Sequence, residues 1–501
     1  MPDYKKLQNG SDIRGVAIAV EGGKPVDLTE DAARAIGGAF AKWLRGRLGE
    51  GAKRVSIGRD SRLSGERLGT WLSDGLRAAG MDVTDFGLCT TPAMFMSTVL
   101  TGWQFDGAVM ITASHLPFER NGFKFFTAEG GLEKQDIAAI LVSAGAGDFP
   151  AGGSGALAKA AFLPAYATML REKIQAATGM EQPLSGLRIL VDAGNGAGGF
   201  FTGEVLAPLG ADTAGSQFLE PDGCFPNHAP NPENAAAMES IRAAVLENKA
   251  DFGIIFDTDV DRAGAVLADG SELNRNRLIA ILSAILLREH PGTTIVTDSI
   301  TSTGLASFIA AHGGVHRRFQ RGYRNVINEA QRLCAAGQDA QMAIETSGHG
   351  ALQENYFLDD GAYLMVKLLI ELARARRDGR TLESLLAGLK EPVESMEFRM
   401  ALNAADFAAY GNEVIAALAE YAKAQPGWTL AEPNYEGVRV NLDPTHGDGW
   451  FLLRLSLHDP LMPLNIESDR AGGAKQIAAA LANFLAGFGK LDSTSLAAFA
   501  E

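Results

Sequence analysis

Three aspartates at alternate positions give the strongest chemical signal in the sequence. Asp257, Asp259 and Asp261 lie in the segment DTDVDR, directly after the apolar segment ADFGIIF. The apolar segment predicts a buried strand, which would carry the carboxylates to the edge of a sheet. Hard oxygen donors that converge on one point suit Mg²⁺ completed by a phosphate oxygen. A solvated acidic turn is the ordinary alternative, and the buried strand favours the metal site.

A second polar loop pairs a hydroxyl with an imidazole. In TASHLPFERNGFKFF, Ser114 precedes His115, and Lys124 follows ten residues after the serine. A hydroxyl nucleophile needs a nearby proton acceptor and a cation for a transferred phosphate. Most serines beside a histidine are only turn or capping residues, so the pair alone is a weak signal. Its place after an apolar strand, matching that of the aspartates, favours the nucleophile.

Two further segments carry groups that suit a sugar phosphate. ETSGHG contains Glu345, Ser347 and His349 around glycines, a set that can pair with neighbouring hydroxyl groups. RLSLHDP places Arg454 and Ser456 two residues apart, which suits a phosphate anchor. Taken alone, the first segment is equally compatible with a solvated turn and the second with an exposed arginine beside a serine.

A weak internal repeat shows how these loops are positioned. Three copies begin with a β-branched strand and a turn: KRVSIGRDSR from Lys53, LRILVDAGNGAG from Leu187 and TTIVTDSITSTG from Thr293. A helix is expected after each turn, and each copy then has a second apolar strand: DGAVMITASH, ADFGIIFDTD and AQMAIETSGH. Ligands of α/β sheets bind beyond the carboxyl ends of strands, so the three polar loops are expected at equivalent places.

The chain is expected to form four domains. The Gly- and Ala-rich segment from Ser143 to Ala160 predicts the first linker. After about Leu389 the pattern changes to strands such as ESMEFRMAL and GWFLLRLSL, with helices near Asn412 to Ala424 and Gly473 to Leu485. The predicted boundaries are 1–155, 156–271, 272–388 and 389–501.

Composition excludes several classes of function. The 501 residues include 45 basic and 60 acidic side chains, and the net charge of -15 disfavours nucleic acid and anionic membranes as partners. An anionic ligand would need local basic groups. The three cysteines, Cys89, Cys224 and Cys334, have no pairing or metal-ligand spacing, which predicts buried structural thiols in a reducing compartment. No signal core or membrane-spanning run is present, so a cytoplasmic location is expected.

Together and in this order, the motifs resemble the α-D-phosphohexomutase superfamily, especially its phosphomannomutase/phosphoglucomutase branch. TASHLP is similar to the family's phosphoserine loop, with Leu116 in place of the usual asparagine, and DTDVDR is similar to the metal loop DGDGDR with both glycines replaced. ETSGHG is similar to the sugar loop. The resemblance implies the α/β class: three related α/β domains with mixed sheets around a central cleft, plus a smaller C-terminal α+β domain.

The resemblance also implies roles for individual residues. SDIRG brings in Arg14, NGFK gives Lys124 a general acid/base role, and RGYRNVI brings Arg324 to the substrate phosphate. The implied catalytic residues are Ser114, His115, Lys124 and Arg14. The implied metal ligands are Ser114, Asp257, Asp259 and Asp261. The implied substrate-binding residues are Arg262, Arg324, Glu345, Ser347, His349, Arg454, Ser456 and His458.

The activity implied by the resemblance is a phosphohexomutase that depends on Mg²⁺. Phospho-Ser114 would interconvert the 1- and 6-phosphates of glucose or mannose through a hexose 1,6-bisphosphate. A phosphoglucosamine mutase and a non-catalytic sugar-phosphate sensor are the alternatives, and the intact serine, aspartates and Lys124 favour an enzyme. Leu457 and His458 depart from the family's phosphate loop, where Gly or Asn and then Thr are usual, which puts phosphate affinity and substrate range in question. The expected partner is a small hexose phosphate, and the expected state is a monomer or dimer.

Overall fold

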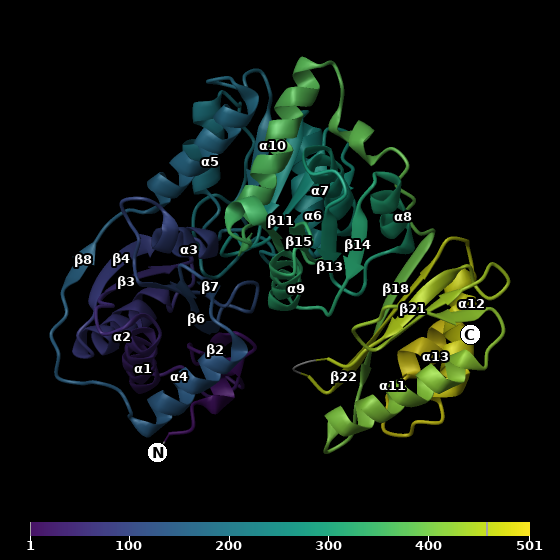
Figure 1. Ribbon diagram of the computed structural model, residues 1–501, viewed down its shortest axis with the longest axis horizontal. Helices are drawn as coiled ribbons and strands as arrows, with labels where there is room; N and C mark the ends of the chain where they lie inside the picture. The colour runs from purple at the N-terminus through teal and green to yellow at the C-terminus, as the bar shows by residue number, and fades with distance from the viewer. Residues whose placement is uncertain (1, 457–458) are drawn as a thin grey trace. The chain divides into compact units, whose positions relative to one another are not determined.

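The chain forms two compact units in the computed structural model, which describes residues 2–456 and 459–501. Unit 1 joins the ranges Met1–Ile285 and Ser347–Leu385, and unit 2 joins Leu286–Thr346 and Leu386–Glu501. The chain therefore changes unit three times, the first time inside α7 (Arg275–Glu289). Figure 1 labels the helices and strands along the chain.

The first domain of unit 1 is built on a mixed eight-stranded sheet in the order β1-β2-β6-β5-β3-β4-β8, with β7 beside β6. β3 pairs in parallel with β4 and β5, whereas β6 runs antiparallel to β5 and β2. Every residue of β5 is buried, as expected of a central strand covered on both faces. The strands are β1 (Gln8–Asn9), β2 (Asp12–Val16), β3 (Arg54–Arg59), β4 (Asp82–Leu88), β5 (Gly107–Ile111), β6 (Arg120–Thr127), β7 (Gly130–Gly131) and β8 (Leu157–Lys159).

Local sequence explains where the helices of this domain begin. The Thr29 hydroxyl accepts a hydrogen bond from Ala32 N at the start of α1, whose first turn carries Glu30 and Asp31. Thr90 caps α3 in the same way, with Pro92 in the first turn. α1 packs against α2 and α4. The helices are α1 (Glu30–Leu48), α2 (Gly65–Ala78), α3 (Thr91–Val99) and α4 (Lys134–Ala146).

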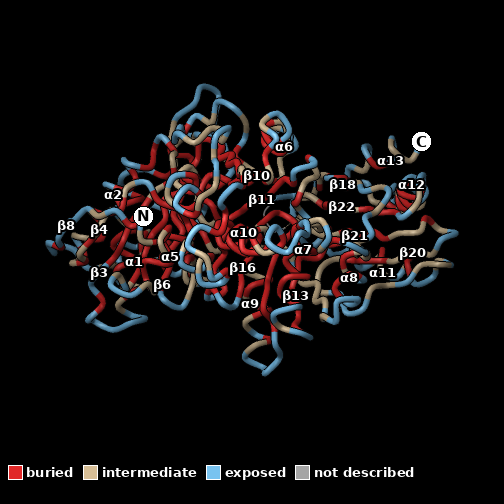
Figure 2. The backbone as a smooth tube through the Cα atoms, turned by 90° about the horizontal axis from the view of Figure 1, so that it is seen from above, coloured by how far each residue is buried: buried red, intermediate tan, exposed pale blue. Residues whose placement is uncertain are grey.

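The second domain of unit 1 has a four-stranded sheet in the order β12-β11-β10-β9, in which only the β9–β10 pair is parallel. The central helix α10 is buried almost all round and packs against α5, β10 and β11. Figure 2 shows this buried backbone in red. The elements are β9 (Ile189–Asp192), β10 (Phe252–Phe256), β11 (Ala263–Leu267), β12 (Glu272–Leu273), α5 (Leu163–Thr178), α6 (Ala235–Asn248) and, from the later range, β16 (Gly350–Leu352), β17 (Leu358–Asp359) and α10 (Gly361–Arg377).

Unit 2 contains a parallel set of strands and an antiparallel sheet. β13 pairs in parallel with β14 and β15, and the mixed five-stranded sheet β14-β13-β15-β16-β17 ends in the antiparallel pair β16–β17. The C-terminal domain has the strand order β18-β22-β21-β20-β19, all antiparallel, with α11 and α12 packed against it. The elements are β13 (Thr294–Thr297), β14 (Val315–Arg318), β15 (Ala340–Ile344), α8 (Thr303–Ala311), α9 (Tyr323–Ala335), β18 (Glu394–Ala401), β19 (Trp428–Leu430), β20 (Val438–Leu442), β21 (Gly449–Leu453), β22 (Leu461–Ser468), α11 (Phe407–Lys423), α12 (Gly473–Leu485) and α13 (Thr494–Ala500).

The predicted α/β class with three mixed-sheet domains and a smaller C-terminal domain is confirmed. In each repeat the second strand, β5, β10 or β15, runs parallel to the first strand, β3, β9 or β13, and leads into its polar loop. No helix in the described part of the chain is long and apolar enough to cross a membrane.

Three local predictions need correction. A π-helical turn, Phe201–Leu206, and a 3-10 turn stand where an α-helix was expected after DAGNGAG. The predicted linker from Ser143 to Ala160 contributes its first residues to α4 and its last to β8, which extends the first sheet beside β4. Of the three cysteines only Cys89 is buried, whereas Cys224 is exposed and Cys334 is intermediate.

Candidate active site

Ser114 lies in the loop between β5 and β6, and its hydroxyl faces the aspartate loop. Ser114 is 3% exposed, and its backbone has a φ of 51°, in the left-handed region. The hydroxyl donates to Asp257 Oδ2 over 2.9 Å and accepts a hydrogen bond from Arg262 Nη2, also 2.9 Å away. The amide of Ser114 donates to Thr112 Oγ1 over 2.8 Å. One buried hydroxyl is thus held between a carboxylate and a guanidinium.

The three aspartates converge at the end of β10. Carboxylate oxygens of Asp257, Asp259 and Asp261 lie within 4.8 Å of one another, and all three residues are buried. Burial raises the pKa of Asp257 well above its usual range, and the charges of Asp261 and Asp259 add to this effect. Within residues 2–456 and 459–501, Asp259 Oδ1 and Asp261 Oδ1 have no hydrogen-bond partner. Buried carboxylates with free oxygens fit a divalent cation.

Lys124, in β6, balances part of this negative charge. Its Nζ donates to Asp259 Oδ2 over 3.1 Å and also to Asp261 Oδ2. Thr91, at the start of α3, donates its hydroxyl to the same Asp259 oxygen over 2.5 Å. Lys124 is 4% exposed, so its ammonium group is held among the carboxylates rather than in solvent.

A neutral imidazole, His115, and a charged guanidinium, Arg262, lie beside Ser114 and contact each other. Arg262 Nη2 donates to His115 Nδ1 over 2.7 Å and to Asp257 Oδ2 over 3.1 Å, and Arg262 is fully buried. Burial lowers the pKa of His115 to about 3, with the charges of Arg262 and Arg14 adding to the shift. His115 is therefore neutral at physiological pH, with Nδ1 accepting and the ring proton on Nε2.

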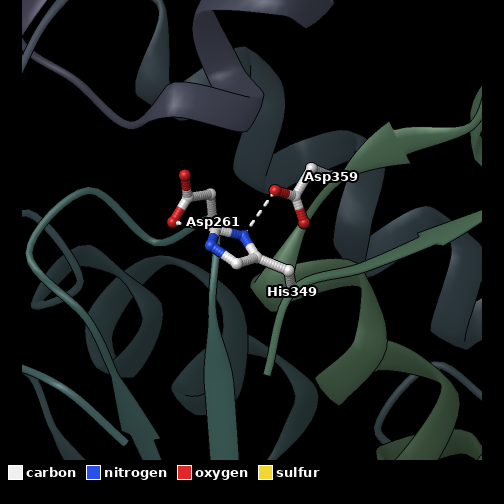
Figure 3. A group of neighbouring side chains, drawn as sticks. All are labelled: Asp261, His349 and Asp359. Carbon is white, nitrogen blue, oxygen red and sulfur yellow. Dashed lines mark hydrogen bonds and ion pairs between the residues drawn. The ribbon is translucent and has the colours of Figure 1, made fainter. Parts of the chain in front are cut away.

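His349 has the opposite electrostatic environment. Its Nδ1 lies 2.6 Å from Asp359 Oδ2 and 4.0 Å from Asp261 Oδ1. Figure 3 shows the imidazole beside these two carboxyl groups. Burial alone would lower the pKa of His349, but the carboxylates of Asp359 and Asp261 outweigh burial and raise it to about 9. The other oxygen of Asp359 accepts from Gly350 N over 2.9 Å. His349 is thus a fixed cation at neutral pH.

The remaining predicted residues lie in both units. In unit 1, Arg14 forms an ion pair of 2.9 Å with Asp12 in β2, next to the strand that carries Lys124. Ser347 is buried in the same unit, and its Oγ has no hydrogen-bond partner among the described residues. In unit 2, Glu345 Oε1 accepts a hydrogen bond over 2.6 Å from the backbone N of Gly322, the residue before α9. Arg324 lies in the first turn of that helix.

The predicted phosphate loop follows β21 in unit 2. Arg454 N donates to Pro463 O over 3.1 Å, and Ser456 N donates to Leu461 O over 2.9 Å. Burial lowers the pKa of Arg454, although the charge of Glu436 opposes this shift. Leu457 and His458 lie outside the described residues.

Sequence reasoning missed several residues that complete the unit 1 site. Thr91 and Asp359 contact site residues directly, and Arg62 binds the backbone of the Ser114 loop. Arg62 belongs to GRDSR, at the end of the first strand of the first repeat, so its position in the repeat was a usable signal. Asp359 precedes a buried helix in a segment of no distinctive spacing.

Comparisons with known proteins agree with this geometry. Models of the phosphoglucomutase/phosphomannomutase family match residues 5–149 as alpha/beta/alpha domain I, 164–270 as domain II and 274–392 as domain III. A phosphomannomutase/phosphoglucomutase of Pseudomonas putida is 32% identical over 84% of this chain and 85% of its own length. A phosphoglucomutase of Neisseria gonorrhoeae is 31% identical over 93% of this chain and 94% of its own.

A solved structure of a phosphoglucomutase/phosphomannomutase family protein from Burkholderia thailandensis has the same fold. It superposes with a TM-score of 0.78 at 29% identity and covers 96% of this chain and 98% of its own. The family models cover all three α/β domains, and the curated relatives extend over most of the sequence. This chain therefore belongs to the phosphoglucomutase/phosphomannomutase family and is a phosphohexomutase, an intramolecular phosphotransferase.

Proposed function

We propose that the protein moves a phosphoryl group between the 1- and 6-positions of glucose or mannose phosphate, with Ser114 as the phosphorylated carrier. The observation that carries this proposal is the setting of the Ser114 hydroxyl, which lies 2.9 Å from both Asp257 Oδ2 and Arg262 Nη2. A buried hydroxyl aligned by a carboxylate and a guanidinium suits an oxygen that alternately attacks and leaves phosphorus.

The first half-reaction breaks the bond between phosphorus and Ser114 Oγ and forms a bond from phosphorus to a sugar hydroxyl oxygen. The proton of that hydroxyl passes to Lys124 in its neutral form, the general acid/base role that the resemblance implies, and Ser114 Oγ takes up a proton as it leaves phosphorus. Arg262 stabilises the charge that develops on Ser114 Oγ, because its Nη2 already donates to that atom. The bisphosphorylated sugar then turns, and the reverse transfer returns its other phosphate to Ser114. No net phosphate is consumed.

A magnesium ion fits the aspartate loop. Mg²⁺ held by Asp257, Asp259 and Asp261, with an oxygen on Ser114, would supply positive charge beside the transferring group. The convergence of the buried carboxylates within 4.8 Å supports this assignment. The chain's own residues keep the loop in place before the ion binds, since Lys124 and Thr91 both donate to Asp259.

The proposed substrate contacts are those that the resemblance implies. Glu345, Ser347 and His349 would bind the sugar, the charged imidazole of His349 suiting an anionic ligand. Arg324, Arg454 and Ser456, with His458, would hold the phosphate that does not react. The names of the relatives, phosphomannomutase and phosphoglucomutase, support glucose and mannose over glucosamine.

A mutase assay with purified protein, Mg²⁺ and a trace of hexose 1,6-bisphosphate tests the proposal. Glucose, mannose and glucosamine 1-phosphates are compared, using the wild type, Ser114→Ala and the control Ser97→Ala. Ser97 is another buried serine of the first domain, whose hydroxyl pairs with Ser56 over 2.8 Å. Activity is expected with glucose and mannose, and only Ser114→Ala should abolish it. Turnover by Ser114→Ala would refute the phosphoserine carrier, and turnover of glucosamine phosphate alone would refute the proposed sugar.

A further inference from the structure

One buried arginine, Arg62, donates hydrogen bonds to several backbone carbonyl groups of the Ser114 loop. It follows β3 in GRDSR and is 2% exposed. Its Nη1 donates to Pro117 O over 2.9 Å and to Arg120 O over 3.0 Å, and its Nη2 donates to Leu116 O over 2.6 Å and also to Ser114 O. A single guanidinium therefore binds three carbonyl oxygens of the loop between β5 and β6 and the carbonyl of the first residue of β6.

Asp60 fixes the direction of this guanidinium. Asp60 Oδ1 accepts from Arg62 N over 2.9 Å, and Asp60 Oδ2 forms an ion pair of 3.3 Å with Arg62 Nε. Both side chains are fully buried. Buried charges are costly unless they are paired, so the ion pair with Asp60 offsets the burial of the Arg62 charge. The planar fork of arginine can reach several oxygens at once, which a lysine ammonium cannot do in the same geometry.

The Ser114 loop needs such support because its backbone is strained. A φ of 51° at a residue other than glycine is unfavourable, and such positions persist only where the surroundings hold them. Arg62 binds the carbonyl of Ser114 itself, and the Ser114 hydroxyl then meets Asp257 and Arg262. Arg62 thus binds the backbone of the serine, and Asp257 and Arg262 bind its hydroxyl.

The second domain of unit 1 packs against the same arginine. The Phe225 ring lies 5.3 Å from the Arg62 guanidinium carbon. A Cβ atom added to Gly223 would lie 2.5 Å from Leu63 N and 2.8 Å from Arg62 Cα, so only glycine allows this approach. The segment around Gly223 therefore closes over Arg62 from a different domain.

We infer that Arg62 is a positioning residue for phosphoryl transfer, which holds the Ser114 loop so that Oγ meets the metal loop. The inference rests on the proposed function of Ser114. Arg62 is buried beneath the loop and donates to its backbone, so its loss should change the rate of transfer and not the binding of the sugar phosphate.

The test compares Arg62→Lys with the control Arg45→Lys in the full chain with Mg²⁺ and hexose 1,6-bisphosphate. Arg45 lies in α1 of the same domain and donates to the single carbonyl of Ala79 over 2.8 Å. A misplacement of about 1 Å can cost about 100-fold in rate, so Arg62→Lys is expected to lower kcat by about that factor with KM nearly unchanged. Hydrogen exchange should rise in residues 112–121 and stay unchanged in Arg45→Lys.

Gly223→Ala is a second variant that leaves the guanidinium intact. Gly223→Ala should also lower kcat, because the added Cβ displaces the segment that packs over Arg62. This variant provides the test if Arg62→Lys does not fold. Wild-type kcat in both variants, or a loss of kcat without increased exchange in residues 112–121, would overturn the inference. Inactivity of the wild type itself would instead refute the proposed function, and the exchange measurement would still decide whether Arg62 holds the loop.

Discussion

Val260 combines a strained backbone with a buried side chain inside the aspartate loop. Its φ is 66°, in the left-handed region, and its side chain is fully buried. β-branched residues rarely adopt this conformation, which costs an L residue about 1–2 kcal/mol. The similar loop DGDGDR has glycine at this position, where the conformation carries no such cost. In this chain the Val260 side chain therefore adds buried apolar surface to the loop, while its backbone conformation is strained.

Val260→Gly should lower the free energy of unfolding less than Val266→Gly, the same substitution in strand β11. Both Val260 and Val266, in β11, are fully buried, so both substitutions lose about the same apolar contact. Only Val260→Gly also relieves backbone strain, so its loss of unfolding free energy should be smaller by about 1–2 kcal/mol. Denaturant unfolding of the two variants measures the difference. Equal losses would show that the strain at Val260 has no energetic weight.

Among the secondary-structure elements, the strands were more predictable from the sequence than the segments that connect them. The ends of β5, β10 and β15 could be placed because a buried apolar run stops at a polar loop in each repeat. The π-helical turn at Phe201–Leu206, after β9, could not be predicted, because residue preferences do not distinguish such a rare turn from an α-helix. β8 was missed because a three-residue edge strand within a Gly- and Ala-rich segment has no periodicity of its own.

In the candidate site, the residues that belong to motifs were predictable from the sequence, and the residues that support them were not. Residues in motifs, such as Ser114, Lys124 and the aspartates, meet in unit 1 as their loops suggested. Arg62 and Asp359 act through contacts that only the folded chain creates, with separations of 52 residues from Arg62 to Ser114 and ten from Asp359 to His349. The repeat places Arg62 at the end of a strand, but no local pattern encodes which distant carbonyl groups its guanidinium binds.

The C-terminal sheet contains a carboxyl group with an altered titration. Glu467, in β22, accepts from Trp450 Nε1 over 2.8 Å and is 7% exposed. Burial raises the pKa of Glu467 to about 7, although the Trp450 hydrogen bond and the charge of Arg439 oppose the shift. Between pH 4.5 and about 7 the unfolded chain loses this proton and the folded chain keeps it. The folded state is therefore destabilised as pH rises through this window.

Glu467→Gln should remove that loss of stability. The unfolding free energy of the wild type, relative to the variant, is expected to fall by up to about 3 kcal/mol between pH 4.5 and 7 and to stay level above it. Calorimetric unfolding at several pH values measures the difference. Glu397→Gln removes an exposed carboxyl from β18 of the same sheet and is the control for the substitution itself. A difference between wild type and Glu467→Gln that is independent of pH would contradict the assignment.

Across the full chain, the proposed metal ligands and the proposed phosphate anchor belong to different units. Asp259 lies in unit 1 with Ser114, whereas Arg454 lies in unit 2. The unit boundary even falls inside the sugar loop, between Thr346 and Ser347. Sequence patterns could not reveal this division, because the loop reads as one continuous motif.

Variants in unit 1 and unit 2 should therefore change different properties, the stabilisation by Mg²⁺ in the first and the KM in the second. Asp259→Asn should abolish the rise in unfolding temperature that Mg²⁺ causes in the wild type, because a carboxylate ligand is lost. Arg454→Lys should keep that rise and increase KM by about tenfold or more, because a forked phosphate contact becomes a point charge. Thermal unfolding with and without Mg²⁺, together with steady-state kinetics, separates the two effects. Loss of the Mg²⁺ response in Arg454→Lys would contradict the separation.

Asp192→Asn is the matched control for the metal response. Asp192 is another buried carboxylate of unit 1, at the end of β9, and pairs with His228 Nε2 over 2.9 Å. The substitution should lower stability, because His228 loses a charged partner, but leave the Mg²⁺-dependent rise in place. A control that also lost the response would show that the rise reports general stability and not a ligand at the aspartate loop.

The interrupted course of the chain has a consequence during synthesis on the ribosome. The first range of unit 1 ends at Ile285, but α10, which covers β10 and β11, belongs to the range that ends at Leu385. At about 5–20 residues per second, the ribosome needs roughly 5–20 s to make the intervening segment. During that interval the nascent sheet presents an apolar face without its helix. The emerging polypeptide is then a natural client for chaperones that bind exposed hydrophobic surface.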